Sequence, residues 1–139
     1  MRIPLVVLCC AALLAFLPAP GHAGDREDQA VKAAQEWLAV VDAGDYGTSW
    51  DQAAQLFKKS VTKEQWEQML SAVRPALGAV VSRNVTSAVY STTLPGAPDG
   101  EYVVIQFETS FANKKSAVET LTPMKDPDGA WRVSGYYVK

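Results

Sequence analysis

The spacing of apolar residues changes period at Gly78, and this change constrains the fold of the chain more than any other feature. Before Gly78, apolar residues recur every three or four positions, which is typical of one face of a helix. After Gly78 they recur at every second position, as in a half-buried strand. Helices followed by strands indicate an α+β domain in which the helices cover one face of a sheet. We therefore predict three N-terminal helices packed on one face of a four-stranded, mostly antiparallel curved sheet.

The three predicted helices differ in how clearly the sequence marks their ends. The first spans 29–42, with Gly44 as a left-handed cap, and the second spans 45–57. A capping box of the Thr-x-x-Gln type opens the third helix, 62–74. We expect this helix to end before Pro75, because the residue that precedes a proline disfavours the helical conformation.

One charged residue falls inside the apolar pattern of the first predicted strand. The four strands are expected at 81–89, 102–111, 117–124 and 131–138. Arg83 shares the register of Val81, Val85 and Val89, so a regular strand would point it at the covered face of the sheet. An unpaired guanidinium is costly there, so Arg83 requires either partners or a function.

Residues 1–23 are typical of a secretory signal peptide. Arg2 precedes the apolar run Ile3–Leu17, and small residues lead up to a cleavage position after Ala23. An apolar run of about 15 residues is shorter than the roughly 20 that a membrane span needs. We therefore expect a single mature domain, residues 24–139, that is periplasmic or secreted and has no membrane span after cleavage.

The predicted leader contains the chain's one histidine, His22, and both of its cysteines, Cys9 and Cys10. A mature domain without imidazole or thiol groups lacks the usual means of Cys–His or Ser–His catalysis and the usual zinc ligands. We expect no cofactor, no metal site and no disulfide. The chain carries 13 basic and 15 acidic residues, and the basic ones are dispersed. This balance argues against a nucleic-acid partner.

Short segments along nearly the whole mature chain resemble a bacterial secreted family known only as domain-of-unknown-function family 4019. The resemblance implies a small envelope protein and no particular activity. The order of elements also resembles the cone-shaped nuclear-transport-factor-two-like or cystatin-like folds, in which helices fill a curved sheet. The segments that carry the family resemblance are Trp37–Tyr46, Ser49-Trp50, Trp66, Arg74-Pro75, Leu77-Gly78, Arg83, Pro95–Tyr102, Glu119-Thr120 and Asp128–Tyr136.

Arg83 has two interpretations. It is either an anion-binding residue in a pocket between sheet and helices, or a structural residue. In the structural case it pairs with Asp42, Glu36 or Glu119, or a β-bulge turns it outward, and we favour this case because buried charges are usually paired. Trp37, Tyr46 and Trp50 line an apolar pocket or are plain core, and aromatics at helical spacing favour core. The candidate ligand-binding set is Asp42, Tyr46, Trp50 and Arg83, and no residue is assigned as catalytic.

Three functions remain open from the sequence. The first is a non-enzymatic domain that binds a small ligand or an envelope protein in the groove between helices and sheet. The alternative is a pocket enzyme of the isomerase or dehydratase type, with Asp42, Glu108 or Glu119 as base and Tyr46 or Tyr136 as proton donor. The third is a unit that oligomerises along an exposed sheet edge or face carrying Tyr102, Val104, Gln106 and Glu108.

Overall fold

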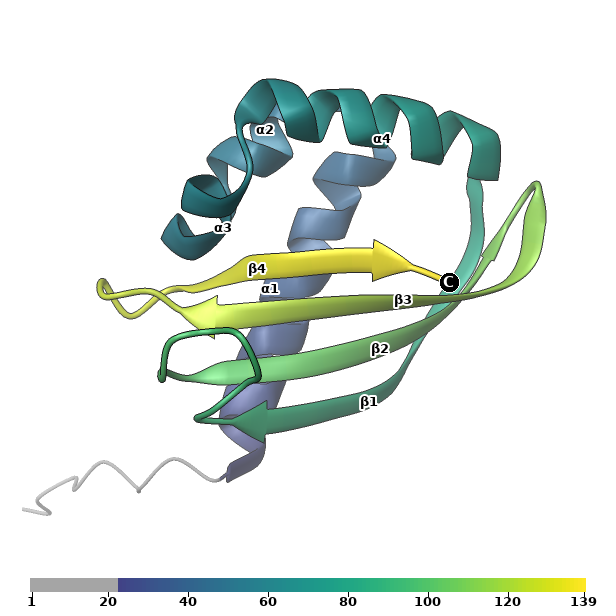
Figure 1. Cartoon of the computed structure of the whole chain (residues 1–139). Helices are drawn as coiled ribbons and strands as arrows, with labels where there is room; N and C mark the ends of the chain where they lie inside the picture. The colour runs from purple at the N-terminus through teal and green to yellow at the C-terminus, as the bar shows by residue number, and fades with distance from the viewer. Residues whose placement is uncertain (1–22) are drawn as a thin grey trace, which may run out of the picture.

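A computed structural model describes residues 23–139, in which four helices are followed by a four-stranded antiparallel sheet (Figure 1). The predicted α+β class and the order of helices before strands are confirmed. The leader predicted at residues 1–23 lies outside the described residues apart from Ala23, the first residue of α1. The elements are α1 (Ala23–Asp42), α2 (Tyr46–Asp51), α3 (Gln55–Ser60), α4 (Lys63–Leu77), β1 (Val80–Ser91), β2 (Tyr102–Phe111), β3 (Lys114–Lys125) and β4 (Trp131–Val138).

The sheet is an open meander in the order β1-β2-β3-β4, with each neighbouring pair antiparallel. Alternation along β2 gives it one buried face. Val103, Ile105, Phe107 and Phe111 are each no more than 1 % exposed, whereas Gln106 and Glu108 are exposed, as the sequence predicts. In Figure 1, α1 crosses behind the sheet and α2, α3 and α4 lie above β4. The core lies between these helices and the buried face of β2 and β3.

Ser49 ties the aromatic part of the core together. Its side chain is fully buried, and its hydroxyl donates to the carbonyl of Tyr46 at 2.6 Å. Trp66 Nε1 donates to the same hydroxyl oxygen at 2.9 Å, and Trp37 Nε1 donates to the Ser49 carbonyl at 2.8 Å. Buried indole N–H groups are costly unless they are paired. These bonds therefore fix the junction of α1, α2 and α4.

The segment predicted as one helix over 45–57 is two short helices, which corrects the predicted helix count from three to four. Ala54 lies between them in an extended conformation, with φ −62° and ψ 153°. Its N–H donates to the Val133 carbonyl on β4 at 2.8 Å. A hydrogen bond to β4 therefore replaces the one that Ala54 N–H would make within a continuous helix. The spacing of apolar residues in this segment does not predict that bond.

The α4 helix begins as predicted but ends later. Thr62 and Gln65 form the capping box, with each side chain bonded to the other residue's backbone N–H. The prediction that the helix ends before Pro75 is wrong, because Pro75 lies inside the helix and Leu77 is its last residue. Gly78 then ends it at φ +79°, and the Gly78 N–H still donates to the Arg74 carbonyl at 3.1 Å. Helical geometry at Arg74 is thus retained despite the proline that follows.

The apolar register predicted for β1 is wrong at Val81 and Val89, whereas Val85 lies opposite the buried Phe107 on the face of Arg83, as predicted. Val81, Val85 and Val89 are 70 %, 39 % and 60 % exposed. Register shifts between Val80 and Ser82 and between Val85 and Ser87 each insert one extra residue into β1. After the second bulge, Ala88 and Tyr90 are the residues of this strand that pack against the core. Arg83 lies between the two bulges and keeps the inward orientation, opposite the buried Thr109 of β2.

No helix in the described part of the chain combines the length and the apolar character that a membrane crossing requires.

Candidate functional site

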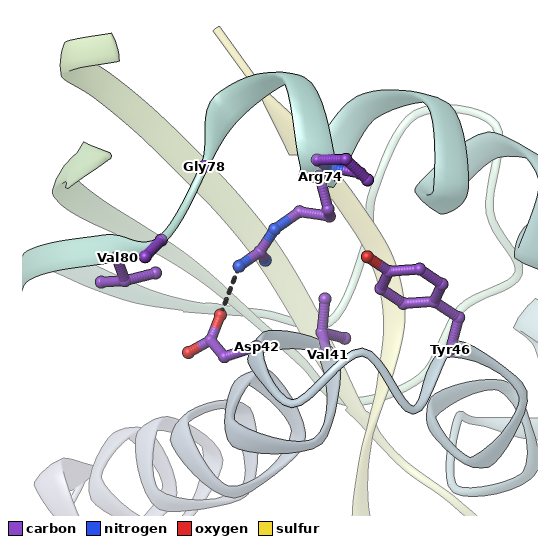
Figure 2. Close-up of a pocket in the computed structure, with 8 residues that line it drawn as sticks. Val41, Asp42, Tyr46, Arg74, Gly78 and Val80 are labelled. Carbon is purple, nitrogen blue, oxygen red and sulfur yellow. Dashed lines mark hydrogen bonds and ion pairs between the residues drawn. The ribbon is translucent and has the colours of Figure 1, made fainter. Parts of the chain in front are cut away.

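The site is built on a network of charged side chains where the C-terminal end of α1 meets α4 and the sheet. Asp42 is the last residue of α1, and Arg74 reaches it from α4 (Figure 2). Arg74 Nη2 donates to Asp42 Oδ1 at 2.6 Å, and the Arg74 side chain is only 6 % exposed. One ion pair thus joins the first and last long helices.

Arg83 joins the same carboxylate from β1. Its Nη1 donates to Asp42 Oδ2 at 2.7 Å and its Nη2 donates to Asp42 Oδ1 at 3.1 Å. On its other edge, Nε donates to Glu119 Oε1 at 2.7 Å and Nη2 donates to Glu119 Oε2 at 3.3 Å. Arg83 therefore bridges two carboxylates with the planar fork that suits guanidinium groups.

Glu119 is the innermost member of the network and is fully buried on β3. Besides Arg83, it accepts hydrogen bonds from the Thr109 hydroxyl at 2.6 Å and from the Tyr136 hydroxyl at 2.5 Å. Arg74 Nη1 also contacts the Tyr136 hydroxyl, at 3.4 Å. Both oxygens of a carboxylate with no solvent access are thus supplied with donors, as a buried charge requires.

The pKa values of the network follow from this pairing. Burial by itself would raise the pKa of Asp42, but hydrogen bonds from Arg83 and Arg74 outweigh it and hold that pKa below its ordinary value of 3.8. Burial would lower the pKa of Arg83, but the bonds to Asp42 and Glu119 raise it instead. Burial and the charge of Glu119 raise the pKa of the Tyr136 phenol. Asp42 and Arg83 stay charged and Tyr136 stays neutral across the physiological range.

A cavity opens beside the network, and we call it the Asp42 pocket. Its volume is about 590 Å³, and Figure 2 shows the side chains that line it. The Asp42 carboxylate and the Tyr46 side chain stand at its wall, with the hydroxyl end of Tyr46 turned toward Arg74. Within the described residues this hydroxyl has no hydrogen-bond partner, although the ring packs against the core. The lining residues are Val41, Asp42, Tyr46, Arg74, Pro75, Gly78, Ala79 and Val80.

The structure brings three of the four predicted ligand-binding residues together and leaves one aside. Asp42 and Tyr46 line the pocket, and Arg83 contacts Asp42 from the sheet side. Trp50 does not line it, since its Nε1 donates to the Val61 carbonyl at 2.9 Å and its ring packs against the core. Whether these residues bind a ligand stays a prediction.

Of the partners considered for Arg83, Asp42 and Glu119 both bind it. Glu36 instead lines a separate cavity beside Trp37 and Trp131. The sequence reasoning missed Arg74 and Thr109 as members of the network. The burial of Arg74 could have been predicted from the sequence. It follows Trp66 and Leu70 at intervals of four residues, which places all three on the buried face of α4. Thr109 gives no such signal, since a threonine in a strand is ordinary.

The described residues contain no group of three or more His, Cys, Asp or Glu side chains arranged to hold a metal ion. The polar groups that line the Asp42 pocket are the Asp42 carboxylate, the Tyr46 phenol and the Arg74 guanidinium, a set that suits an organic ligand through hydrogen bonds.

Comparison with known proteins identifies a family without an assigned activity. Residues 33–136 match the family described as "Protein of unknown function (DUF4019)", and the chain belongs to that family. No curated protein matches the chain.

Proposed function

We propose that this chain is an exported, non-enzymatic binding domain, and that the Asp42 pocket takes a small ligand carrying a hydrogen-bond donor. The observation that carries the proposal is the unfilled acceptor capacity of Asp42. A carboxylate offers about four acceptor positions. Oδ1 receives two hydrogen bonds, from Arg74 and Arg83, and Oδ2 receives one, from Arg83. One position on Oδ2 remains for a ligand, on a side chain that is 28 % exposed.

The rest of the lining defines the ligand further. The Tyr46 hydroxyl offers a second polar contact, as donor or acceptor. Val41, Pro75 and Val80 give the pocket an apolar part. The charges of Asp42 and Arg74 balance each other, so the pocket has no strong preference for a ligand's net charge. We infer a small amphipathic molecule that presents a hydroxyl or ammonium group to Asp42 and a short apolar part to the three aliphatic residues.

The pKa directions favour binding over acid–base catalysis. A general base that works near neutral pH needs a pKa raised toward that range. The pKa of Asp42 is lowered instead, because two guanidiniums bond to it. The pKa of Tyr136 is raised, and its proton is already engaged by Glu119. Asp42 is therefore a poor general base at this wall, which disfavours the isomerase or dehydratase alternative.

The export part of the proposal rests on residues 1–23. The positive start, apolar run and small residues before position 24 are those of a leader that a signal peptidase removes. Intact-mass measurement of the protein purified after expression of the full-length chain tests this. We expect the mass of residues 24–139. The mass of the whole chain, recovered from the cytoplasm, would contradict export.

Ligand binding is tested with two small probes, ethanolamine and acetate. Ethanolamine carries ammonium and hydroxyl donors, whereas acetate carries only acceptors. Followed by ¹⁵N–¹H NMR, ethanolamine should shift the amide signals of Gly78, Ala79 and Val80, and acetate should not. Tyr46→Phe should weaken ethanolamine binding about 2- to 10-fold through the loss of one hydrogen bond.

Tyr90→Phe is the matched control. It removes the same atom from a tyrosine of β1 whose hydroxyl bonds to Glu101 at 3.2 Å, and it should leave ethanolamine binding unchanged. Equal responses to the two probes, or shifts that map away from the Asp42 pocket, would contradict the proposed site.

A further inference from the structure

A second cavity, which we call the Trp131 cavity, lies where α1, the end of α2 and the start of β4 meet. Its volume is about 360 Å³, within the range of roughly 300–1,000 Å³ that is usual for small-molecule pockets. It shares no lining residue with the Asp42 pocket. Its polar and aromatic lining side chains are Glu36, Trp37, Asp51, Gln52, Trp131 and Arg132.

Two carboxylates reach this cavity from two different helices. Glu36 lies on α1, and Asp51 is the last residue of α2. Asp51 binds Lys63 Nζ at 3.0 Å, in a pair that is exposed to solvent. Glu36 forms no ion pair or hydrogen bond with the other residues that the structure describes. The Glu36 carboxylate can therefore pair with a cation that comes from outside the chain.

The basic side chains beside the cavity are already paired. Arg132 lines it, but its Nη1 donates to Asp126 at 3.0 Å and its Nη2 donates to Asp128 at 2.8 Å. Counted with the lysine that binds Asp51, two basic side chains stand beside four carboxylates, of which one is Glu36. This excess of negative charge favours a cationic ligand over an anionic one.

The half-buried ring of Trp131 gives the cavity an aromatic wall, to which Trp37 adds a second indole. Cations are attracted to aromatic ring faces, and most strongly to that of tryptophan. Basic side chains of this chain lie over the rings of Trp50, Tyr90 and Tyr137. Among residues 23–139, none lies over the ring of Trp131. An indole beside an unpaired carboxylate is suited to an alkylated ammonium group.

The indole nitrogen of Trp131 points to a second feature of the ligand. The indole N–H groups of Trp37, Trp50 and Trp66 each donate to an oxygen of the chain. Trp131 Nε1 is buried as well, but it has no hydrogen-bond partner among the described residues. A buried N–H without an acceptor costs free energy. A ligand oxygen that accepts from this N–H removes that cost, which favours a ligand with an oxygen near its charged group.

We propose that the Trp131 cavity binds a small quaternary ammonium compound that also carries an oxygen acceptor. The ammonium group lies against the Trp131 ring and beside the carboxylates of Glu36 and Asp51, and the oxygen accepts from Trp131 Nε1. A methylated ammonium fits this wall better than a bare one, because it is more weakly hydrated and so loses less on contact with the ring. The inference is independent of the proposed function, since it uses a separate cavity and a cation without N–H donors.

The test uses choline and its neutral isostere neohexyl alcohol, in which a carbon atom replaces the charged nitrogen. Both are titrated into the purified protein at an ionic strength held constant with sodium chloride, and ¹⁵N–¹H NMR follows the signals. Choline should shift the indole N–H of Trp131 and the amides of Gln52 and Val133 in a saturable manner. Neohexyl alcohol should bind about 10-fold more weakly, because it lacks the charge that the ring and the carboxylates attract.

Glu36→Gln keeps the size of the side chain and removes the unpaired charge, so it should weaken choline binding about 3- to 10-fold. Glu64→Gln is the matched control, because Glu64 is an exposed carboxylate in the first turn of α4, away from the cavity. It should leave choline binding unchanged. Trp131→Leu should abolish binding, with the melting temperature recorded to show that the variant is folded.

Four results would overturn the proposal. They are the absence of a saturable shift with choline, equal binding of choline and neohexyl alcohol, equal binding of choline to Glu36→Gln and Glu64→Gln, and shifts confined to Gly78, Ala79 and Val80. The last result would place choline in the Asp42 pocket, so the two sites are told apart in the same spectra. If Trp131→Leu fails to fold, Glu36→Gln and the pair of probes decide the question.

Discussion

Two arginines of this chain each bridge two carboxylates, and their surroundings differ. Arg83 binds Asp42 and Glu119 at 2.7 Å, and Arg132 binds Asp126 at 3.0 Å and Asp128 at 2.8 Å. Each bridge holds one buried carboxylate, Glu119 or Asp126, but Arg83 is 15 % exposed against 33 % for Arg132, and the outer carboxylate is 28 % exposed at Asp42 against 57 % at Asp128. The geometry of the two bridges is alike, so the difference in burial decides what each contributes.

The two bridges also differ in what they connect. The partners of Arg83 are 41 and 36 residues away, and they join α1, β1 and β3. The partners of Arg132 are 4 and 6 residues away in one hairpin. Breaking the Arg83 bridge removes a contact between distant elements and leaves the buried charge of Glu119 without its guanidinium partner. Breaking the bond between Arg132 and Asp128 affects only one hairpin turn. Similar ion pairs thus carry fold-level or local roles according to sequence separation and solvent access.

The largest effect should come from Arg83→Ala. Glu119 would remain buried with only two hydroxyl donors, so the free energy of unfolding should fall by about 3–5 kcal/mol. Urea denaturation measures this directly. Asn84→Ala, which alters the exposed neighbour on the same strand, should change stability little and serves as control. An Arg83→Ala protein as stable as the wild type would show that the network is not structural.

Tyr136→Phe should have a smaller effect on the same cluster. It removes the hydrogen bond to Glu119 and keeps the ring that packs edge-on against Trp37 with centroids 5.5 Å apart. A hydrogen bond to a charged acceptor contributes about 1.5–3 kcal/mol. We expect a loss of that size by urea denaturation, against no loss for Tyr137→Phe at the exposed neighbouring position. Equal effects from the two variants would mean that the phenol does not support Glu119.

Acid should weaken the Asp42 end of the network. The pKa of Asp42 in the folded protein lies below its ordinary value of 3.8, so the unfolded chain binds the proton first as the pH falls. The stability that Asp42 contributes is therefore complete above about pH 5 and is lost as the pH falls through the folded pKa. Thermal melts from pH 6 to pH 2 should show this decline. Asp42→Asn should have a lower melting temperature at pH 6 and a shallower decline, and a decline as steep as that of the wild type would contradict the role of Asp42.

The smallest effect should come from Asp128→Asn in the hairpin. Hydrogen bonds from Arg132 and from the Ala130 backbone lower the pKa of Asp128 to about 2. The side chain is nevertheless exposed, and an exposed ion pair contributes little to stability because water screens it. Asparagine keeps an acceptor for Ala130 N–H, and Arg132 keeps Asp126. A change in unfolding free energy approaching that of Arg83→Ala would remove the contrast between the two bridges.

The sequence predicted those features that depend on local pattern. Alternation along β2, the capping box at Thr62 and the left-handed conformation of Gly44 follow from neighbouring residues alone, and all three are confirmed. The inward position of Arg83 and two of its candidate partners, Asp42 and Glu119, also followed from a charge in an apolar register. The cost of an unpaired buried charge is thus enough to predict the part of the network around Arg83.

The missed features depend on contacts distant in sequence. The extended conformation of Ala54 is fixed by a bond to Val133, 79 positions later. The bulges of β1 shift the register of Val89 without leaving a gap in the alternation of the sequence. Trp50 packs against the core instead of lining the pocket, and its Nε1 donates to the carbonyl of Val61, 11 positions later. The spacing of neighbouring residues cannot predict such contacts, because the same local sequence is compatible with the predicted and with the observed structure.

The central claim is that Asp42 is a fixed, ionised acceptor at the wall of a binding pocket and not a catalytic base. The titration of its carboxyl carbon, followed by ¹³C NMR from pH 7 to pH 2, tests this most directly. We predict a midpoint below the ordinary 3.8, because Arg83 and Arg74 stabilise the charged form. A midpoint at pH 5 or above would contradict this account and favour a base poised for proton transfer.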